Sequence, residues 1–317
     1  MSTDPGALEA RPLFAVWGNC QAEVIARVIQ ESPGFKARYQ HAKLPPCYLA
    51  TSGEVQGWLQ AHAPKVGLLI SQKLKTGWRG EAVFDTSTLH QASAPGSRLL
   101  RWSDTYYRGY APMMAYPVAF PRVSALSDYV NIVAELAWLH DRREDMLRLY
   151  SDPGVIPQET VLSIHETALR DLAAREDDCD LKAAPYLAQQ WRSGRQFESF
   201  NHPRRPLVVN LVNQALDHLG IEDRAPEKGR PTFSRGFGLP AFAAFDAILD
   251  APEHSDGPGP FIMKGQKISA EQYFSEWFQA FDRLGRDKIE ADLAAHERNQ
   301  ISNMLLSAVA RAWNIPL

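Results

Sequence analysis

Short apolar runs alternate with helix-patterned segments over the first hundred residues, and this alternation restricts the possible folds most. The runs LFAVW (13–17), VGLLIS (66–71) and SRLLRW (97–102) have the length and composition of buried strands. Residues 21–30 and 54–63 have the spacing of helices, and 35–39 is expected to be a further strand. Strands that alternate with helices form βαβ units, so the sequence predicts an α/β fold with a small, mostly parallel sheet and flanking helices.

The rest of the chain has a different pattern. Residues 127–140, 158–175, 206–219, 237–249 and 270–310 favour helix, and the last segment is expected to break near Gly285. No strong strand pattern follows residue 120 or so. We therefore predict an α/β part over residues 1–120 that carries the nucleophile. A mainly helical part over 121–317 is expected to complete one globular unit.

Composition argues against several classes of protein. The 317 residues carry a net charge of −3, whereas nucleic-acid binders are more often strongly basic, so no nucleic-acid partner is predicted. The first residues, MSTDPGALEARP, contain no apolar signal-peptide core, and no segment approaches the ~18 consecutive apolar residues of a membrane span. Three widely separated cysteines do not form a disulfide framework. The predicted location is the cytoplasm.

One cysteine lies at the junction between the first strand and the first helix, in GNCQ (18–21). Ligands of open α/β sheets bind beyond the carboxyl ends of the strands. Backbone N–H groups at a helix N-terminus favour negative charge, so we expect a lowered pKa for the Cys20 thiol and donors for an oxyanion. Gly18 permits the tight turn, and Asn19 and Gln21 supply further amide donors. Alternatively, Cys20 is a small, inert residue in a buried turn.

A nucleophilic thiol needs a base, and His202 in ESFNHPRRP (198–206) is the candidate. It precedes a predicted helix, and the neighbouring Asn201 can position its ring. Arg204 and Arg205, which follow, can bind phosphate. The other interpretation of this segment is a helix-entry loop with surface arginines.

Two further segments follow predicted strands and therefore lie at the same edge of the sheet. In SQKLKTGWRG (71–80), Gln72 can donate to an oxyanion. The candidates for contacts with a phosphorylated ligand and its base are Lys73, Lys75, Trp78 and Arg79. The segment WSDTYYRGYAP (102–112), which includes Tyr110, can line a sugar or nucleotide pocket. The alternatives are a solvated basic loop and aromatic packing against a helix.

Several well-known motifs are incomplete or missing. HETAL (165–169) lacks the second histidine of H-E-x-x-H, and the three cysteines do not have zinc-ligand spacing, so no metal is predicted. Cys179 lies in EDDCD, where acidic neighbours disfavour thiolate. Neither a G-x-G-x-x-G after a strand nor a P-loop is present, so a Rossmann dinucleotide site and a P-loop are unsupported.

The segments above, taken in order, resemble the polysaccharide biosynthesis enzyme WcbI family of capsule gene clusters in Gram-negative bacteria. The resemblance covers roughly residues 12–220. It is carried by GNCQ (18–21), ISQ (70–72), YYRGYAP (106–112), SDYVNIVAEL (127–136), AREDDCDL (174–181) and FNHP (200–203).

The resemblance implies an O-acetyltransferase that uses acetyl-CoA and acts on a heptose unit of a capsular polysaccharide or its precursor. It also implies coenzyme A in a cleft near the Gly-Asn-Cys turn, with Cys20 and His202 as the catalytic pair. Asn19 and Gln72 would assist at the oxyanion. In one route Cys20 carries the acetyl group as a thioester; in the other, His202 activates the sugar hydroxyl for direct attack.

Two other functions compete with the transferase. An SGNH-like esterase would use the same strand–turn–helix nucleophile, but it prefers serine at position 20 and an Asp-x-x-His pair near the C-terminus. Here Leu293 stands three residues before the last histidine, His296. The second alternative is a non-catalytic protein of capsule assembly that binds a nucleotide sugar.

Overall fold

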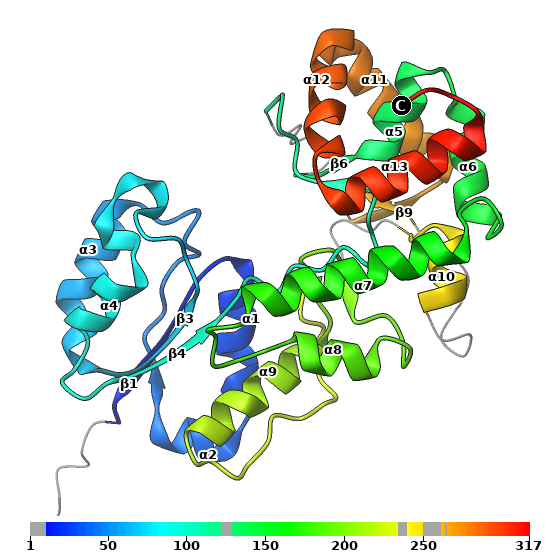
Figure 1. Ribbon diagram of the computed structural model, residues 1–317. Helices are drawn as coiled ribbons and strands as arrows, with labels where there is room; N and C mark the ends of the chain where they lie inside the picture. The colour runs from blue at the N-terminus through cyan, green and yellow to red at the C-terminus, as the bar shows by residue number, and fades with distance from the viewer. Residues whose placement is uncertain (1–10, 122–127, 234–239, 250–260, 264) are drawn as a thin grey trace, which may run out of the picture. The chain divides into compact units, whose positions relative to one another are not determined.

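The structure is a computed structural model that describes residues 11–121, 128–233, 240–249, 261–263 and 265–317 (Figure 1). The chain forms two compact units, each built from separate segments. The first contains the described residues up to Thr105 together with 173–186 and 205–232. The second contains 106–172, 187–204 and the described residues from Phe233 onward. The division predicted at residue 120 separates the chain by the type of secondary structure. The compact units differ from it, because residues 173–186 and 205–232 belong to the same unit as the sheet.

The first unit is built on a four-stranded sheet in the order β2-β1-β3-β4, with every neighbouring pair parallel. The strands are β1 (Leu13–Trp17), β2 (Gln40–His41), β3 (Val66–Gln72) and β4 (Arg98–Trp102). The register pairs Trp17 with Ser71 and Gln72 with Trp102, so the carboxyl ends of β1, β3 and β4 meet at one edge. The predicted small parallel sheet is confirmed.

Helices cover both faces of this sheet. Helices α3 (Ser52–Ala61) and α4 (Thr86–Ala92) lie on one side, and α1 (Cys20–Ile29) and α9 (Arg205–His218) lie on the other (Figure 1). The core between the sheet and the α3 side contains the side chains of Trp17, Val55, Leu69 and Phe84, all fully or almost fully buried. The short helices η1 (Ala63–Lys65), η2 (Trp78–Gly80) and η3 (Ala82–Phe84) complete this side.

The strand predicted over residues 35–39 is wrong. These residues belong mostly to helix α2 (Pro33–Arg38), and the chain becomes extended only at β2. Ser32 is the N-cap, because its side chain accepts a hydrogen bond from the Phe35 N–H, and Pro33 occupies the first helical turn. Ser32-Pro33 therefore starts a helix as well as ending the previous one.

The second unit is mainly helical, as predicted. It contains α5 (Ile132–Leu139), α6 (Arg143–Ser151), α10 (Ala243–Leu249), α11 (Ala270–Leu284), α12 (Arg286–Glu297) and α13 (Gln300–Trp313). Helices α7 (Gln158–Arg175) and α8 (Ala184–Gln190) run from one unit into the other. The strands are short antiparallel pairs: β5 (Met114–Ala115) with β6 (Val130–Asn131), β7 (Phe197–Ser199) with β8 (His202–Pro203), and β9 (Phe261–Met263) with β10 (Gln266–Ile268).

Some helices begin at a different residue from the one predicted, because capping residues set where they start. Helix α5 starts at Ile132 rather than at 127, because the Asn131 side chain accepts from the N–H groups of Val133 and Ala134. The predicted break near Gly285 is confirmed, and Asn299 caps a further helix start. Residues 127 and 237–239 of the predicted helices lie outside the described residues.

Within the described residues, no helix is both long and apolar enough to cross a membrane.

Replacement of Ser32 by alanine tests the corrected assignment of α2. Ser32 is fully buried and its hydroxyl caps the helix, so we expect Ser32→Ala to lower the free energy of unfolding by about 1 kcal/mol in urea denaturation. Ser87→Ala, at an exposed helical position, is the control and should change little. Equal stabilities of the two variants would contradict the capping role of Ser32.

Candidate functional site

The turn from β1 to α1 places Cys20 at the carboxyl edge of the sheet, as the sequence predicts. Asn19 is the N-cap, because its Oδ1 accepts from the Gln21 N–H at 2.9 Å, and Cys20 is the first residue of α1. The Cys20 side chain is partly buried. The turn therefore presents a thiol at the N-terminus of a helix beyond the end of a parallel strand.

Gly18 allows the ends of three strands to come together. A Cβ at this position would lie 2.8 Å from both Cβ and Oε1 of Gln72, and 2.9 Å from the Trp102 ring. Real Cβ atoms do not come this close to other heavy atoms. The carbonyl of Gly18 also accepts a hydrogen bond of 2.7 Å from the Cys47 N–H. The absence of a side chain at this position is thus a packing requirement of the site.

The side chains of Asn19 and Gln72 hold the turn in place. The Asn19 backbone N–H donates to Gln72 Oε1 at 2.8 Å, and Asn19 Nδ2 donates to Asp104 Oδ1 at 3.0 Å. Both residues were predicted to donate to an oxyanion. In the structure the Asn19 side-chain donor and the Gln72 carbonyl oxygen bond within the protein and fix the turn beside Cys20, while donation by Gln72 Nε2 to an oxyanion stays a prediction.

The side-chain amide of Gln21 also forms hydrogen bonds within the protein. Its side-chain Nε2 donates to the Thr105 carbonyl at 3.0 Å, and its Oε1 accepts from the Thr105 N–H at 3.1 Å. This pair of bonds ties the start of α1 to the segment that follows β4. Gln21 is 2% exposed, so its amide is a positioning group in this structure.

Asp104 is a residue of the site that the sequence analysis did not single out. Its charge acts on the Cys20 thiol, and it accepts the hydrogen bond from Asn19. Burial raises the pKa of Asp104, while the hydrogen bond from Asn19 and the charge of Arg175 act to lower it. Its position directly after β4, in the segment WSDTYY, was the available signal, because a carboxylate there lies at the same sheet edge as Cys20.

The expected lowering of the Cys20 pKa is wrong. Burial raises the pKa of this thiol to about 11, and the negative charge of Asp104 acts in the same direction. The backbone N–H groups of Cys20 and Gln21 favour thiolate, as the helix N-terminus predicts, but they are outweighed. The thiol is therefore protonated at neutral pH.

The other two cysteines are also protonated. Burial and Asp104 raise the pKa of Cys47 to about 12, so the same carboxylate acts on two thiols. Burial and Asp178 raise the pKa of Cys179 to about 11, in line with the expectation from its acidic neighbours.

The basic loop after β3 divides into residues that face solvent and residues that pack. Lys73 and Lys75 are exposed, and Lys73 forms an ion pair with Asp178. The Trp78 ring packs edge-on against Phe84, with centroids 6.1 Å apart. The Arg79 guanidinium lies over the Phe84 ring at 4.5 Å and donates to two main-chain carbonyls, at residues 47 and 50. Trp78 and Arg79 thus stabilise the loop itself.

A polar cavity of about 320 Å³ lies in the first unit beside β4 and α4. The cationic side chains Lys73 and Arg101 line it, together with His90, the hydroxyl groups of Thr86 and Ser87, and one acidic residue, Asp85. Asp178 lies close to both cations, 3.8 Å from the Arg101 guanidinium. The two cations can therefore attract an anionic group to the cavity, although Asp178 already compensates part of their positive charge.

His202 lies on β8 of the second unit, whereas Cys20 belongs to the first. Its ring stacks on Phe233, with centroids 4.3 Å apart and planes 16° apart. Burial lowers the pKa of His202 to about 4, and the charge of Glu198 acts in the opposite direction. The imidazole is neutral at pH 7 and can accept a proton. Its pairing with Cys20 stays a prediction.

The predicted neighbours of His202 have distinct roles. Asn201 is buried, with hydrogen bonds to Ser199, Tyr116 and Tyr129, so it anchors the β7–β8 hairpin. Tyr110 is also buried, and its hydroxyl donates to the Trp191 carbonyl at 3.0 Å.

The two adjacent arginines diverge. Arg204 forms an ion pair with Glu198 at 3.1 Å in the second unit. Arg205 is 7% exposed and belongs to the first unit, where it pairs with Glu31 and donates to the carbonyls of residues 226, 227 and 230. The guanidinium of Arg205 is thus committed to joining α1 to the loop after α9.

With this geometry established, the comparisons with known proteins identify the family. The model of the family described as polysaccharide biosynthesis enzyme WcbI matches residues 13–224, which is more than half of the chain. The chain belongs to the WcbI family. This membership makes it one of a family of polysaccharide biosynthesis enzymes, and the matched residues include Cys20, Gln72 and His202. No curated protein matches the sequence.

A solved WcbI structure has the same fold as this WcbI-family chain. The TM-score is 0.87 at 21% sequence identity, and the match covers 96% of this chain and 100% of the other. That protein is described as a novel polysaccharide biosynthesis enzyme, in its native form without a disulfide bond between coenzyme A and one of its cysteines. The structural match extends the likeness over helices α11 to α13, which lie outside the family match.

Replacement of Gly18 by alanine tests the packing of the strand ends. The added Cβ would collide with Gln72 and Trp102, so we expect Gly18→Ala to destabilise the protein by about 1–3 kcal/mol in urea denaturation. Gly57→Ala is the matched control. Nothing lies within 4 Å of a Cβ there, and the position is inside helix α3, so it should be neutral or slightly stabilising. A Gly18 variant as stable as the control would contradict the packing argument.

Replacement of Asp104 by asparagine tests the electrostatics of the thiol. Removal of the negative charge stabilises the thiolate, so the pKa of Cys20 should fall and its alkylation at pH 8 should accelerate at least about threefold. Peptide mapping by mass spectrometry measures each cysteine separately. Cys47 should also react faster, whereas Cys179 is an internal control because Asp104 does not act on it. An unchanged rate at Cys20 would show that burial alone sets its pKa.

Proposed function

We propose that this WcbI-family protein is an acyltransferase that moves the acetyl group of acetyl-CoA to a sugar hydroxyl. The proposed acceptor is a heptose unit of a capsular polysaccharide or of its precursor. The proposal rests on the family and on one structural observation: the rigid turn that holds Cys20 at the N-terminus of α1, at the carboxyl edge of the sheet. Ligands of open α/β folds bind at this edge.

The chemistry of acyl transfer suits this turn. Attack on an acetyl carbonyl produces an oxyanion, and backbone N–H groups at a helix N-terminus stabilise such charge. The N–H groups of Cys20 and Gln21 already favour the anionic form of the thiol. The solved WcbI structure is described as the native protein without a disulfide bond between coenzyme A and one of its cysteines, which associates coenzyme A with a cysteine of that protein. We carry this association over to Cys20 as part of the proposal.

Two routes of transfer are compatible with these residues. In the covalent route, His202 takes the proton of the Cys20 thiol, the sulfur attacks the acetyl carbonyl, and coenzyme A leaves as the thiol with that proton. The sugar hydroxyl then gives its proton to His202 and takes the acetyl group, and the proton returns to the Cys20 sulfur. In the direct route, His202 takes the proton of the sugar hydroxyl, the new ester bond forms, and coenzyme A leaves as the thiol. The pKa of about 11 for Cys20 favours the direct route, because thiolate is scarce, whereas the neutral imidazole of His202, with a pKa of about 4, is present as the base in either route.

Contacts within the protein reduce the number of residues that we propose as ligands of the coenzyme phosphates. Arg79 and Arg205 donate to main-chain carbonyls or to Glu31 and are left out. Lys73 and Arg101 line the polar cavity of the first unit, and Lys75 is exposed in the same loop. We propose these three side chains as the phosphate contacts.

Substitution of the catalytic pair tests the proposal. We expect His202→Gln to lower kcat for sugar acetylation about 100-fold or more, because the general base is lost, while calorimetric binding of coenzyme A persists. His62→Gln, at an exposed histidine of the first unit, should leave both quantities unchanged. The acetylated heptose is measured by mass spectrometry.

Cys20→Ala separates the two routes in the same assay. The direct route predicts that most of the rate remains, and the covalent route predicts its loss together with an acetylated Cys20 peptide in the parent protein. Acetate release without sugar acetylation would support the esterase instead. Failure of the parent protein to bind either coenzyme A or acetyl-CoA would overturn the proposed function.

A further inference from the structure

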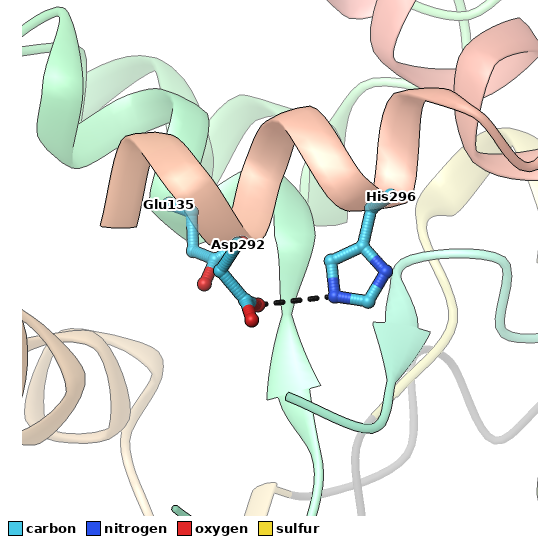
Figure 2. Close-up of side chains that lie close together, drawn as sticks. All are labelled: Glu135, Asp292 and His296. Atoms are coloured by element: carbon cyan, nitrogen blue, oxygen red, sulfur yellow. Dashed lines mark hydrogen bonds and ion pairs between the residues drawn. The ribbon is translucent and has the colours of Figure 1, made fainter. Parts of the chain in front are cut away.

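Three buried ionisable side chains lie together in the helical second unit, whereas Cys20 belongs to the first unit. Asp292 and His296 are four residues apart on α12 and so share one face of that helix. Glu135 comes from α5. Figure 2 shows the carboxylates of Glu135 and Asp292 beside each other, with the His296 ring facing Asp292. Asp292 and Glu135 are 0% exposed and His296 is 7% exposed.

The spacing of these groups is close to that of ligands around one metal ion. Each residue offers one donor atom, and the three atoms lie within 4.8 Å of one another. His296 Nε2 and Asp292 Oδ2 form a hydrogen bond of 3.0 Å, and a metal ion bound to both atoms would displace the proton between them. Neighbouring ligands of a tetrahedral zinc ion, at about 2.0–2.2 Å from the metal, are roughly 3.4 Å apart. The three atoms would have to approach one another by no more than roughly 1.4 Å to reach this spacing.

Glu135 supplies the independent evidence for a ligand. Among the described residues, no N–H or O–H group donates to either of its carboxylate oxygens, although the side chain is fully buried, and its polar neighbour is the Asp292 carboxylate, with which it can share a hydrogen bond only when one of the two is protonated. A buried carboxylate without a partner is costly, because it loses its hydration and gains nothing in return. It points at a second buried carboxylate, which adds repulsion (Figure 2). A cation between the two would compensate both.

Asp292 is held in the orientation that a metal ligand needs. Its Oδ1 accepts from the backbone N–H groups of Val118 and Ala119, the latter at 2.6 Å. Its other oxygen, Oδ2, faces His296. Ligating carboxylates in metalloproteins are commonly fixed by such outer hydrogen bonds.

We propose that Glu135, Asp292 and His296 bind a divalent transition-metal cation of the zinc type, which joins helices α5 and α12. One imidazole nitrogen and two carboxylate oxygens suit zinc better than calcium or magnesium, which take six or more ligands that are mainly oxygens. Three protein ligands leave one position for a water molecule.

This site differs from the expectation of no metal and is independent of the proposed acetyl transfer. The sequence prediction rested on cysteine spacing and on an incomplete H-E-x-x-H. Here the ligands combine an Asp-x-x-x-His pair on one helix with a glutamate about 160 positions earlier. Asp292 and His296 also lie outside the residues of the family match.

Without a cation, the cluster has one other stable state. Burial, the charge of Asp292 and a hydrogen bond shared with Asp292 raise the pKa of Glu135 well above its usual range, so that the carboxyl would carry a proton. The two states predict different effects of Glu135→Gln on the cluster: the substitution should be tolerated if Glu135 is protonated, and it should weaken metal binding if Glu135 is a ligand. An amide imitates a protonated carboxyl but is a poor replacement for a metal-binding carboxylate.

The test uses the full-length protein after dialysis against a chelator. Calorimetric titration with Zn²⁺ should show one equivalent bound, and the melting temperature should rise with Zn²⁺ concentration. Co²⁺ should bind at the same stoichiometry and give visible absorption bands of a low-symmetry site. Glu135→Gln should weaken Zn²⁺ binding at least about tenfold and abolish the zinc-dependent rise in melting temperature.

Glu290→Gln is the matched control, because Glu290 is an exposed carboxylate on the same helix α12. It should bind Zn²⁺ like the parent protein. If the parent protein takes up neither Zn²⁺ nor Co²⁺, or if Glu135→Gln binds them equally well, the proposal is overturned and the cluster is a protonated carboxyl pair. His296→Gln provides the same comparison if the Glu135 variant does not fold.

Discussion

The close approach of three strand ends at Gly18 is the constraint on which the candidate site depends. Because a Cβ there would collide with Gln72 and Trp102, the ends of β1, β3 and β4 can meet only around a residue without a side chain. Once they meet, the Asn19 N–H reaches Gln72, its side-chain amide reaches Asp104, and its oxygen caps α1. These hydrogen bonds fix the turn between β1 and α1, and with it the position of Cys20.

The packing that builds the turn also sets its protonation. Burial and the Asp104 carboxylate keep the Cys20 thiol neutral, although the helix N-terminus acts in the other direction. Burial keeps His202 neutral as well. In the proposed reaction, two groups that are each neutral suit a step in which the proton moves as the bond forms, whereas a preformed thiolate and imidazolium would need weaker desolvation.

The sequence predicted much of the fold because hydrophobic periodicity reflects burial directly. The strands at 13–17, 66–72 and 98–102 and helix α7 follow from their own apolar patterns. The error at residues 35–39 arose because a short apolar segment suits either element, and the Ser32 cap decided between them. In the site, the placement of Cys20 and Gln72 was predictable, since the end of a strand and the start of a helix are local features. The role of Asp104 was not, because it requires the proximity of two strand ends.

By itself, the sequence determined a parallel α/β half followed by a helical half, with a thiol at the edge of the sheet, since these depend on neighbours along the chain. The tertiary structure decided which polar side chains are already committed. Arg205 and Arg79 resemble phosphate ligands in the sequence, yet they bind carbonyls and Glu31 in the folded chain. It also decided the pKa values and brought Glu135 to Asp292 and His296. The physical reason is the same in each case: desolvation and long-range charge depend on distances through space, which spacing along the chain does not contain.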